Sequence, residues 1–280
     1  MEIMELIFII KAAIIGVVEG ITEFLPISST GHMIMVGDLI NFKAPTYDKA
    51  YINMFEIVIQ LGAILAIVVL YWDKIFNSLK NIKPGKWGFK LWVIILIAFL
   101  PSAVLGVIFN NLIQEKLFNS ITVASALIVG GVLMIYMENK YRRGNSTKNI
   151  EDVNIFQAFK IGCFQCLALW PGMSRSASTI MGGWISGLTN VAAAEFSFFL
   201  AIPTMIAASG WSLIKVKIDM SIMQVIALSV GFIVSFLVAL VVVEKFMNFL
   251  KRKPMRVFAI YRIFIGIIVL ILTVTKVISV

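Results

Sequence analysis

Histidine and cysteine are scarce in this sequence, which limits the metal and redox chemistry that it can carry. There is one histidine, His32, and there are two cysteines, Cys163 and Cys166, among 280 residues. A structural zinc site takes about four ligands, and this CxxC pair stands in an apolar stretch with no histidine to complete a site. We therefore expect both cysteines to be small, unreactive residues of the core.

Charged residues are also few. They make up 14% of the chain, whereas hydrophobic residues make up 60%, and soluble domains are about a quarter charged. The apolar runs are long and continuous rather than alternating, which indicates membrane-spanning helices and not the strands of a β-barrel. The net charge of +9 would suggest nucleic acid in a soluble protein, but here basic cytoplasmic loops explain it. We expect the bilayer as a partner and no nucleic acid.

Six apolar stretches are long enough to cross a hydrocarbon core, which takes about 20 residues of helix. They are approximately residues 52–72, 91–110, 121–137, 192–214, 222–243 and 257–279. The fold class that this pattern predicts is an all-α, polytopic membrane protein.

Two further regions, residues 6–40 and 155–188, are apolar at both ends and polar around a central proline. Pro26 and Pro171 each break a helix, because proline lacks the N–H that a helix interior needs. Each half-helix is too short to span the bilayer comfortably. We therefore expect two re-entrant, broken-helix segments beside the six spans.

The two broken regions resemble each other, which predicts an internal duplication. The first reads GVVEGITEFLPISSTGH and the second GCFQCLALWPGMSRSAST, and FEIVIQLGAIL is echoed by AEFSFFLAIP, at an offset of about 140–145 residues. We expect a single membrane domain, residues 1–280, made of a first half (1–140) and a second half (150–280). Each half has three full spans, so the second half enters the membrane inverted. Inverted repeats place a binding site where their broken helices meet.

Basic residues are concentrated in three loops, which orients the chain. The crossing count puts residues 73–90, 138–154 and 244–256 on the same side, and cytoplasmic loops carry an excess of lysine and arginine. The basic side is then cytoplasmic. The first broken segment opens to the outer face of the membrane, and the second opens to the cytoplasm.

Glu19 and Glu23 are four residues apart, so on a helix they share a face. Ionisable groups within a membrane segment are costly and are by default functional. The alternative is a structural role, in which these carboxylates face an aqueous vestibule or pair with Arg175.

Hydroxyl residues follow Pro26 in the first segment. Ser28 and Ser29 are natural N-caps for the next half-helix, and Thr30 comes directly after them. A helix N-terminus presents free backbone N–H groups and the positive end of the helix dipole, which suit a phosphate. We expect Ser28 and Thr30 to contact a phosphate substrate and Ser29 to be free for chemistry, although capping alone would also explain the serines.

The second segment carries an anion-binding pattern, PGMSRS, around Arg175. Gly172 allows the turn, and Ser174 and Ser176 flank the arginine. A guanidinium is always charged and matches two phosphate oxygens at once. We expect these four residues to bind phosphate. The alternative is an arginine that snorkels to the membrane interface.

His32 comes three residues after Ser29 and faces the same site if the stretch is helical. A histidine there can take a proton from an attacking group and return it to a leaving one. Carboxylates beside a phosphate repel it unless a cation intervenes, so we also expect a divalent cation, Mg²⁺ or Ca²⁺, bound by Glu19 and Glu23. The whole set predicts a phosphate ester or diphosphate with a lipid tail as the substrate.

GVVEGITEFLPISSTGH and GCFQCLALWPGMSRS closely resemble the motifs of the undecaprenyl-diphosphate phosphatases, the bacitracin-resistance proteins of bacterial inner membranes. FEIVIQLGAILAIVV, EFSFFLAIP and FAIYR extend the resemblance over essentially the whole chain. The family's glutamate motif falls on Glu19 and Glu23, its serine–histidine motif on residues 28–32, and its PGxSRS motif on residues 171–176. The resemblance implies a multi-pass enzyme of the inner membrane that removes the terminal phosphate of undecaprenyl diphosphate and regenerates the carrier for cell-wall synthesis.

The sequence therefore predicts a polyprenyl-diphosphate phosphatase. Ser29 is the predicted nucleophile, His32 the general base and acid, and Arg175 the group that stabilises the transferring phosphoryl group. Glu19 and Glu23 would bind the metal or position water. A histidine nucleophile stays open, as does a homodimer. The rival functions are a polyprenyl-phosphate transporter or flippase, since inverted repeats are transporter features, and an anion channel, which would give no reason for a nucleophile beside a base.

Overall fold

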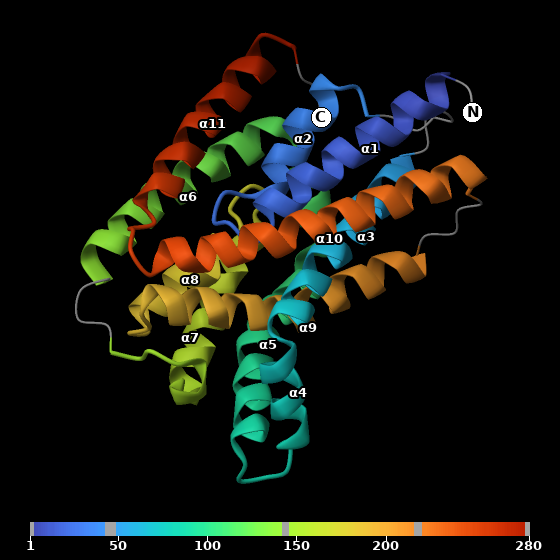
Figure 1. Cartoon of the computed structure of the whole chain (residues 1–280). Helices are drawn as coiled ribbons and strands as arrows, with labels where there is room; N and C mark the ends of the chain where they lie inside the picture. The colour runs from blue at the N-terminus through green and yellow to red at the C-terminus, as the bar shows by residue number, and fades with distance from the viewer. Residues whose placement is uncertain (1–2, 43–48, 142–145, 216–219, 278–280) are drawn as a thin grey trace.

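A computed structural model of the chain describes residues 3–42, 49–141, 146–215 and 220–277. In these residues the chain is helical apart from turns, short links and one isolated β-bridge between Thr147 and Leu188. The all-α prediction is therefore confirmed (Figure 1). The elements are α1 (Ile3–Thr22), α2 (Ser29–Leu39), α3 (Lys49–Leu70), α4 (Trp72–Lys80), α5 (Trp87–Lys116), α6 (Ser120–Tyr141), η1 (Ile150–Asp152), α7 (Ile155–Gln165), η2 (Cys166–Leu169), α8 (Arg175–Ile185), α9 (Asn190–Lys215), α10 (Ile222–Leu250) and α11 (Arg256–Val274).

Six helices in the described residues are long and apolar enough to cross a membrane. They are Ala50–Leu70, Trp87–Ile113, Ser120–Tyr141, Asn190–Gly210, Ile222–Leu250 and Arg256–Val274. All six predicted spans are matched, so the chain is a multi-pass membrane protein. Arg142 and Arg143, in the basic loop at 138–154, and the last residues of the sixth predicted span lie outside the described residues.

The basic segment at 73–90 contains a helix that the sequence analysis did not predict. α4 follows α3 after a single residue and lies against the first part of α5 (Figure 1). The indole Nε1 of Trp92 in α5 donates a hydrogen bond to Ser78 Oγ of α4 at 2.9 Å. α4 is amphipathic: Ile75 is buried, whereas Trp72 and Phe76 are exposed. The segment is therefore a packed helical hairpin rather than an open loop.

Lys74 of α4 joins three elements that are distant in the sequence. Its Nζ lies 2.7 Å from Glu151 Oε1 of η1 and 2.8 Å from Glu195 Oε1 of α9. Burial lowers the pKa of Lys74, but its hydrogen bonds with the two carboxylates outweigh burial and raise the pKa above its ordinary value. The ammonium is therefore charged at neutral pH and stabilises the position of the first turns of α9.

Both predicted helix breaks are present. Pro26 lies in the turn between α1 and α2, and Pro171 lies between η2 and α8. α2, α7 and α8 have 11 residues each, as half-helices should. α1 is different: it has 20 residues, which is about 30 Å of helix, so the expectation that every half is too short to span is wrong here. Lys11 interrupts the apolar run but not the helix, because lysine is a good helix former. Its Nζ donates to the carbonyl oxygen of Asn41 at 3.0 Å. Re-entry of the two segments stays a prediction.

The first helix of each half packs against the other half, and the last helices of the two halves pack against each other. α1 lies along α10, α7 along α5, and α6 along α11, as Figure 1 shows for the first and last of these pairs. Glycines allow the close approach: a Cβ on Gly16 would lie 2.6 Å from the carbonyl oxygen of Gly231, and a Cβ on Gly162 would overlap the carbonyl of Ala98. Gly16 and Gly162 stand at matching places in the two motifs. A duplication predicts this exchange, and the inverted orientation of the halves stays a prediction.

The two cysteines of the CxxC pair are not core residues, so that expectation is wrong. Both are free thiols; Cys163 is exposed and Cys166 is half-buried. The reason is the direction of α7, which turns Gly162 and Ala158 toward the core and Cys163 away from it. The exposed position lies on the apolar outer surface of the helix.

Candidate active site

Two links bring the predicted site residues together. The link between α1 and α2, residues 23–28, and the link between η2 and α8, residues 170–174, lie side by side near the middle of the molecule (Figure 1). The hydroxyl of Ser176, in the first turn of α8, donates to the carbonyl oxygen of Phe24 in the first link at 2.8 Å. The first residue of α2 and the first residue of α8 therefore face one site.

Arg262 of α11 contacts the backbone of both links. This arginine is fully buried. Its Nη2 donates to the carbonyl oxygens of Met173 at 2.7 Å and Gly172 at 3.1 Å, and its Nη1 lies 3.5 Å from the carbonyl oxygen of Pro26. One side chain thus contacts carbonyls of both links, so neither link can move without losing a charge-assisted hydrogen bond.

The two links have the same unusual backbone conformation at one serine. Ser28 has φ 73 and ψ 99, and Ser174 has φ 70 and ψ 120. Both serines cap the following helix, Ser28 through the N–H of Gly31 at 3.4 Å and Ser174 through the N–H of Ala177 at 3.2 Å. The capping role predicted for Ser28 is confirmed, whereas Ser29 is the first residue of α2 and not its cap. A positive φ is costly for a residue with a side chain, and such strain concentrates at functional sites.

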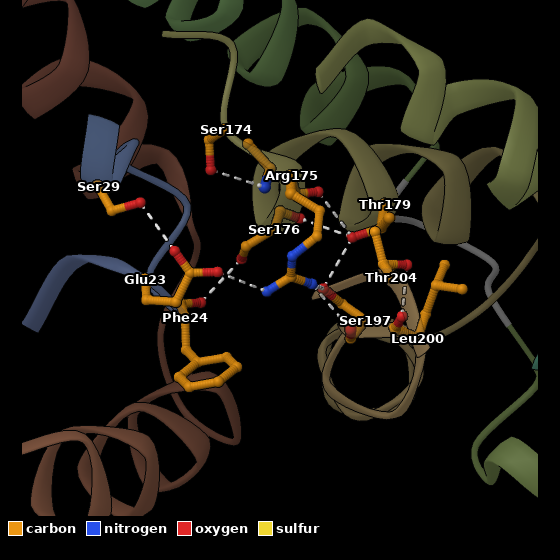
Figure 2. A network of polar contacts seen from close by, with 11 residues as sticks. Glu23, Phe24, Ser29, Ser174, Arg175, Ser176, Thr179, Ser197, Leu200 and Thr204 are labelled. Carbon is orange, nitrogen blue, oxygen red and sulfur yellow. Dashed lines mark hydrogen bonds and ion pairs between the residues drawn. The ribbon is translucent and has the colours of Figure 1, made fainter. Parts of the chain in front are cut away.

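Glu23 is the meeting point of the two segments. The hydroxyl of Ser29 donates to Glu23 Oε2 at 2.8 Å, and Arg175 Nη2 donates to Glu23 Oε1 at 3.2 Å. Figure 2 shows the carboxylate between the serine and the guanidinium. Glu23 and Ser29 are buried, and the side chain of Arg175 is 10% exposed. The sequence left open that one of the two glutamates pairs with Arg175. Glu23 forms this ion pair, and Glu19 does not.

Arg175 is fixed from its other side by α9. Its Nη1 donates to Ser197 at the carbonyl oxygen, 3.0 Å away, and at Oγ, 3.3 Å away. The hydroxyl of Thr179 in turn donates to Ser197 Oγ at 2.7 Å (Figure 2). The Nε of Arg175 has no partner among the described residues. A buried guanidinium with a free N–H is an oriented donor for an incoming anion. The snorkelling alternative is wrong for this residue.

Glu19, in α1, lies one turn before Glu23, the first residue of the link to α2. It is fully buried, and within the described part of the chain neither of its carboxylate oxygens has a hydrogen-bond partner. The charges of Glu23 and of Glu56 in α3 act unfavourably on its charged form, and the charge of Arg175 acts favourably on it. Two unpartnered acceptors beside other acids form a site that would attract a cation.

His32 is buried in the first turn of α2, but its ring nitrogens hydrogen-bond to groups other than the Ser29 hydroxyl. Its Nδ1 lies 2.7 Å from the carbonyl oxygen of Ser28, and its Nε2 lies 2.8 Å from the hydroxyl of Tyr261 in α11. The atom next to the Ser29 hydroxyl is a carboxylate oxygen of Glu23. In the resting geometry the proton acceptor for Ser29 is therefore Glu23 rather than His32.

The remaining predicted residues lie around the same point. Thr30 is half-buried in the first turn of α2 and Ser176 is fully buried. Gly172 has φ 96, a conformation that favours glycine, and a Cβ there would lie 2.5 Å from the carbonyl oxygen of Val123. Gly172 is thus required by the turn and by the tight packing on α6.

A divalent cation would have to be bound mostly by groups from outside the chain. No group of three or more histidine, cysteine, aspartate or glutamate side chains is placed to bind a metal ion in the residues that the structure describes. Glu19 offers two free oxygens. Magnesium is usually bound by one or two carboxylates, with water and substrate phosphates completing its shell. The donor set fits a cation that arrives with a phosphate substrate.

Comparison with known proteins identifies the family. The family described as bacitracin resistance protein BacA matches residues 12–268. The chain belongs to this family. An undecaprenyl-diphosphatase of Clostridium tetani is 57% identical to it over 276 residues, which cover 98% of this chain and 100% of the relative. A second, of Clostridium novyi, is 60% identical over 97% of this chain and 98% of the relative. A third, of Caldanaerobacter subterraneus, is 52% identical over 99% of this chain and 100% of the relative.

The BacA match spans both links and the part of α11 that contacts them. Three residues of the site escaped the sequence analysis: Ser197, Tyr261 and Arg262. A signal for Arg262 was present, because a charged residue inside the apolar run 257–279 is by default functional. Ser197 and Tyr261 carried no such signal of their own, since a serine or a tyrosine in a membrane helix is ordinary, but both lie in the stretches EFSFFLAIP and FAIYR that carry the family resemblance.

Proposed function

We propose that this member of the BacA family hydrolyses undecaprenyl diphosphate to undecaprenyl phosphate and inorganic phosphate. That reaction would recycle the lipid carrier for cell-wall synthesis and confer bacitracin resistance. The full-length relatives named undecaprenyl-diphosphatase support the substrate. The observation that carries the chemistry is the Ser29–Glu23 hydrogen bond beside Arg175. It places a hydroxyl, a proton acceptor and an anion-binding cation at one point in a membrane protein.

In the first step the Ser29 oxygen attacks the terminal phosphorus. A bond forms between Oγ and phosphorus, the bond from phosphorus to the bridging oxygen breaks, and undecaprenyl phosphate leaves. Glu23, 2.8 Å from Oγ, takes the hydroxyl proton, as a general base must be within hydrogen-bond reach of the proton it removes. The guanidinium of Arg175 and the N–H groups at the starts of α2 and α8 stabilise the charge on the transferring phosphoryl group.

In the second step water attacks the phosphoserine. The bond between phosphorus and Oγ breaks, the protonated Glu23 returns to Oγ the proton that it took in the first step, and phosphate leaves with both protons of the attacking water as H₂PO₄⁻. Glu23 is suited to both steps, because its second oxygen stays on Arg175 while the first exchanges a proton. The same carboxylate thus acts as base and then as acid.

A divalent cation, Mg²⁺ or Ca²⁺, belongs to the proposal. Glu19, and Glu23 with it, would bind the ion, and it would neutralise diphosphate oxygens that the two carboxylates would otherwise repel. The unpartnered oxygens of Glu19 support this assignment. Hydroxyl residues at the starts of α2 and α8 would surround the bound phosphate. They are the N-caps Ser28 and Ser174 and the first-turn residues Thr30 and Ser176.

The finer location is also a proposal. The asymmetry of the basic loops supports a position in the bacterial inner membrane with the active site opening to the outer, periplasmic face. A homodimer stays a prediction, for which cross-linking in the native membrane is the measurement.

Phosphate release separates hydrolysis from transport. The purified protein in detergent, with undecaprenyl diphosphate and Mg²⁺, should release inorganic phosphate continuously, and Ser29→Ala should not. A flippase without hydrolytic activity would release none from the wild-type protein while still moving labelled lipid between the leaflets of a vesicle. That result would overturn the proposed reaction.

A further inference from the structure

The contacts of His32 define which of its ring nitrogens carries the proton. The atom next to Nδ1 is the carbonyl oxygen of Ser28, 2.7 Å away, and a carbonyl can only accept a hydrogen bond. Nδ1 is therefore protonated. In the neutral ring Nε2 is then the acceptor, and the hydroxyl of Tyr261, 2.8 Å away, donates to it. The two rings also stack, with centroids 5.6 Å apart and planes 11° from parallel.

The second link makes the same hydrogen bond with a different side chain. Ser178 stands four residues after Ser174, as His32 stands four residues after Ser28. Its Oγ donates to the carbonyl oxygen of Ser174 at 2.8 Å. Both carbonyls belong to the serines with positive φ. Four residues after the serine with positive φ, the first half therefore has a histidine, His32, and the second half a serine, Ser178. Each binds the carbonyl oxygen of that earlier serine.

A serine hydroxyl in that environment does not serve as a general base, so the feature shared by the two side chains is donation to the carbonyl. Such a bond fixes the peptide that follows the strained serine. In the first link that peptide leads directly into Ser29, whose hydroxyl must stay on Glu23. The bond from His32 thus stabilises the turn that directs the nucleophile.

We propose that His32 is a positioning residue for the Ser29 turn, and that Tyr261 of α11 is a second positioning residue that fixes the His32 ring. Tyr261 acts through Nε2 and through stacking, from a helix outside both sequence motifs. The role of Ser29 in this inference rests on the proposed function. The tautomer of His32 and its bond to Tyr261 do not.

The matched pair His32→Ser and His32→Ala tests the positioning role. A serine at this position can donate to the carbonyl four residues earlier, as Ser178 does and as helical serines commonly do; alanine cannot, and both variants leave the same space where the imidazole was. Displacing a reacting group by roughly 1 Å costs about 10²-fold in rate. We expect His32→Ala to lose about that much in kcat and His32→Ser to be faster than His32→Ala by about tenfold or more. Equal rates in two well-folded variants would overturn the positioning role and favour His32 as the base.

Nitrogen NMR tests the contacts without turnover. The chain has a single histidine, so ¹⁵N-histidine labelling of protein purified through a histidine-free tag reports His32 alone. We expect a protonated Nδ1 and an Nε2 signal that moves downfield in Tyr261→Phe, where its hydrogen bond is lost. Tyr136→Phe, in an exposed part of α6, is the control and should change nothing. An unprotonated Nδ1, or an Nε2 signal unaffected by Tyr261→Phe, would overturn the inference.

Failure of the proposed role of Ser29 and failure of the inference on His32 and Tyr261 can be told apart. If Ser29→Ala retained turnover, the proposed role of Ser29 would fail while the ¹⁵N signals kept their predicted pattern. If the ¹⁵N pattern failed while Ser29→Ala was inactive, the inference on Tyr261 would fall and the proposed reaction would stand.

Discussion

Arg175 Nη2 lies 3.2 Å from Glu23 Oε1, although the two residues are 152 positions apart in the sequence. The other oxygen of the same carboxylate accepts the hydroxyl of Ser29. A phosphate that binds the guanidinium must therefore approach within reach of both the serine and the acid (Figure 2). This one ion pair joins the two halves of the chain at the point where we place the reaction.

Arg175→Lys keeps the positive charge but loses the planar guanidinium group with its several N–H donors. We expect kcat to fall by about 10²–10³-fold, the usual cost of one preorganised donor, because an ammonium cannot contact Glu23, Ser197 and phosphate in one plane. Phosphate release is the measurement, with Arg252→Lys on the exposed surface as the matched control. Near-normal turnover in folded Arg175→Lys would reduce the arginine to a structural partner of Glu23.

Ser29→Ala should abolish turnover while diphosphate binding persists. Ser28→Ala removes the N-cap of α2 instead, which typically costs about 1 kcal/mol of stability, and should leave slow activity. Binding of radiolabelled substrate, together with acid-quenched trapping of the phosphoenzyme, separates the two variants. A trapped phosphate on His32 would exclude the serine as nucleophile.

Removal of divalent cations should stop the reaction, and addition of Mg²⁺ or Ca²⁺ should restore it. Glu19→Gln is nearly isosteric and carries no charge; the matching position of the second motif is already a glutamine, Gln165. We expect this variant to need at least about tenfold more cation for half-maximal activity, since one of the two carboxylate ligands is lost. Asp73→Asn is a surface control. Full activity in the presence of a strong chelator would exclude the metal.

Arg262→Met should destabilise the protein and inactivate it together. The variant removes the donor of the carbonyls of Gly172 and Met173, and each buried group left unsatisfied costs about 1–3 kcal/mol. We expect the free energy of unfolding to fall by at least about 2 kcal/mol, measured as the shift of the denaturation midpoint in mixed micelles. Arg252→Met, on the exposed surface, should shift it little. An unchanged midpoint would contradict the contacts assigned to Arg262.

The orientation can be measured by thiol labelling. In a chain without the two native cysteines, single cysteines at Lys83, Asn149 and Lys253 should resist a membrane-impermeant reagent applied to intact cells, whereas a cysteine at Glu115 should react. All four positions are exposed in the structure. Labelling of the first three from outside would reverse the orientation and place the proposed active site on the cytoplasmic face.

The features that the sequence predicted are local ones. Hydropathy alone locates the six spans. Pro26 and Pro171 mark the breaks because polar residues surround each of them, whereas Pro101 and Pro203, in apolar runs, lie inside α5 and α9. The caps at Ser28 and Ser174 follow from the same short-range logic. The proposed roles of the site residues, in contrast, stay predictions that the variants above have to test.

The features that the sequence did not predict depend on contacts between distant segments. Which acid pairs with Arg175, which group accepts the proton of Ser29, and what fixes His32 are all decided by how α1, α8 and α11 pack. The length of α1 was also misjudged, because the helix continues through the polar Lys11 and Glu19 and has 20 residues. No periodicity within one segment contains that information.

The exchange of helices between the halves has a consequence for biosynthesis. α1 leaves the ribosome long before its packing partner α10, Ile222–Leu250, and the arginine that fixes both links comes later still, in α11. A nascent chain that already contains both motifs therefore has no assembled centre until α11 is inserted. Chains released early, before Arg262 is made, should accumulate as membrane-bound but inert fragments, and co-expression of the missing C-terminal helices as a separate polypeptide should restore activity.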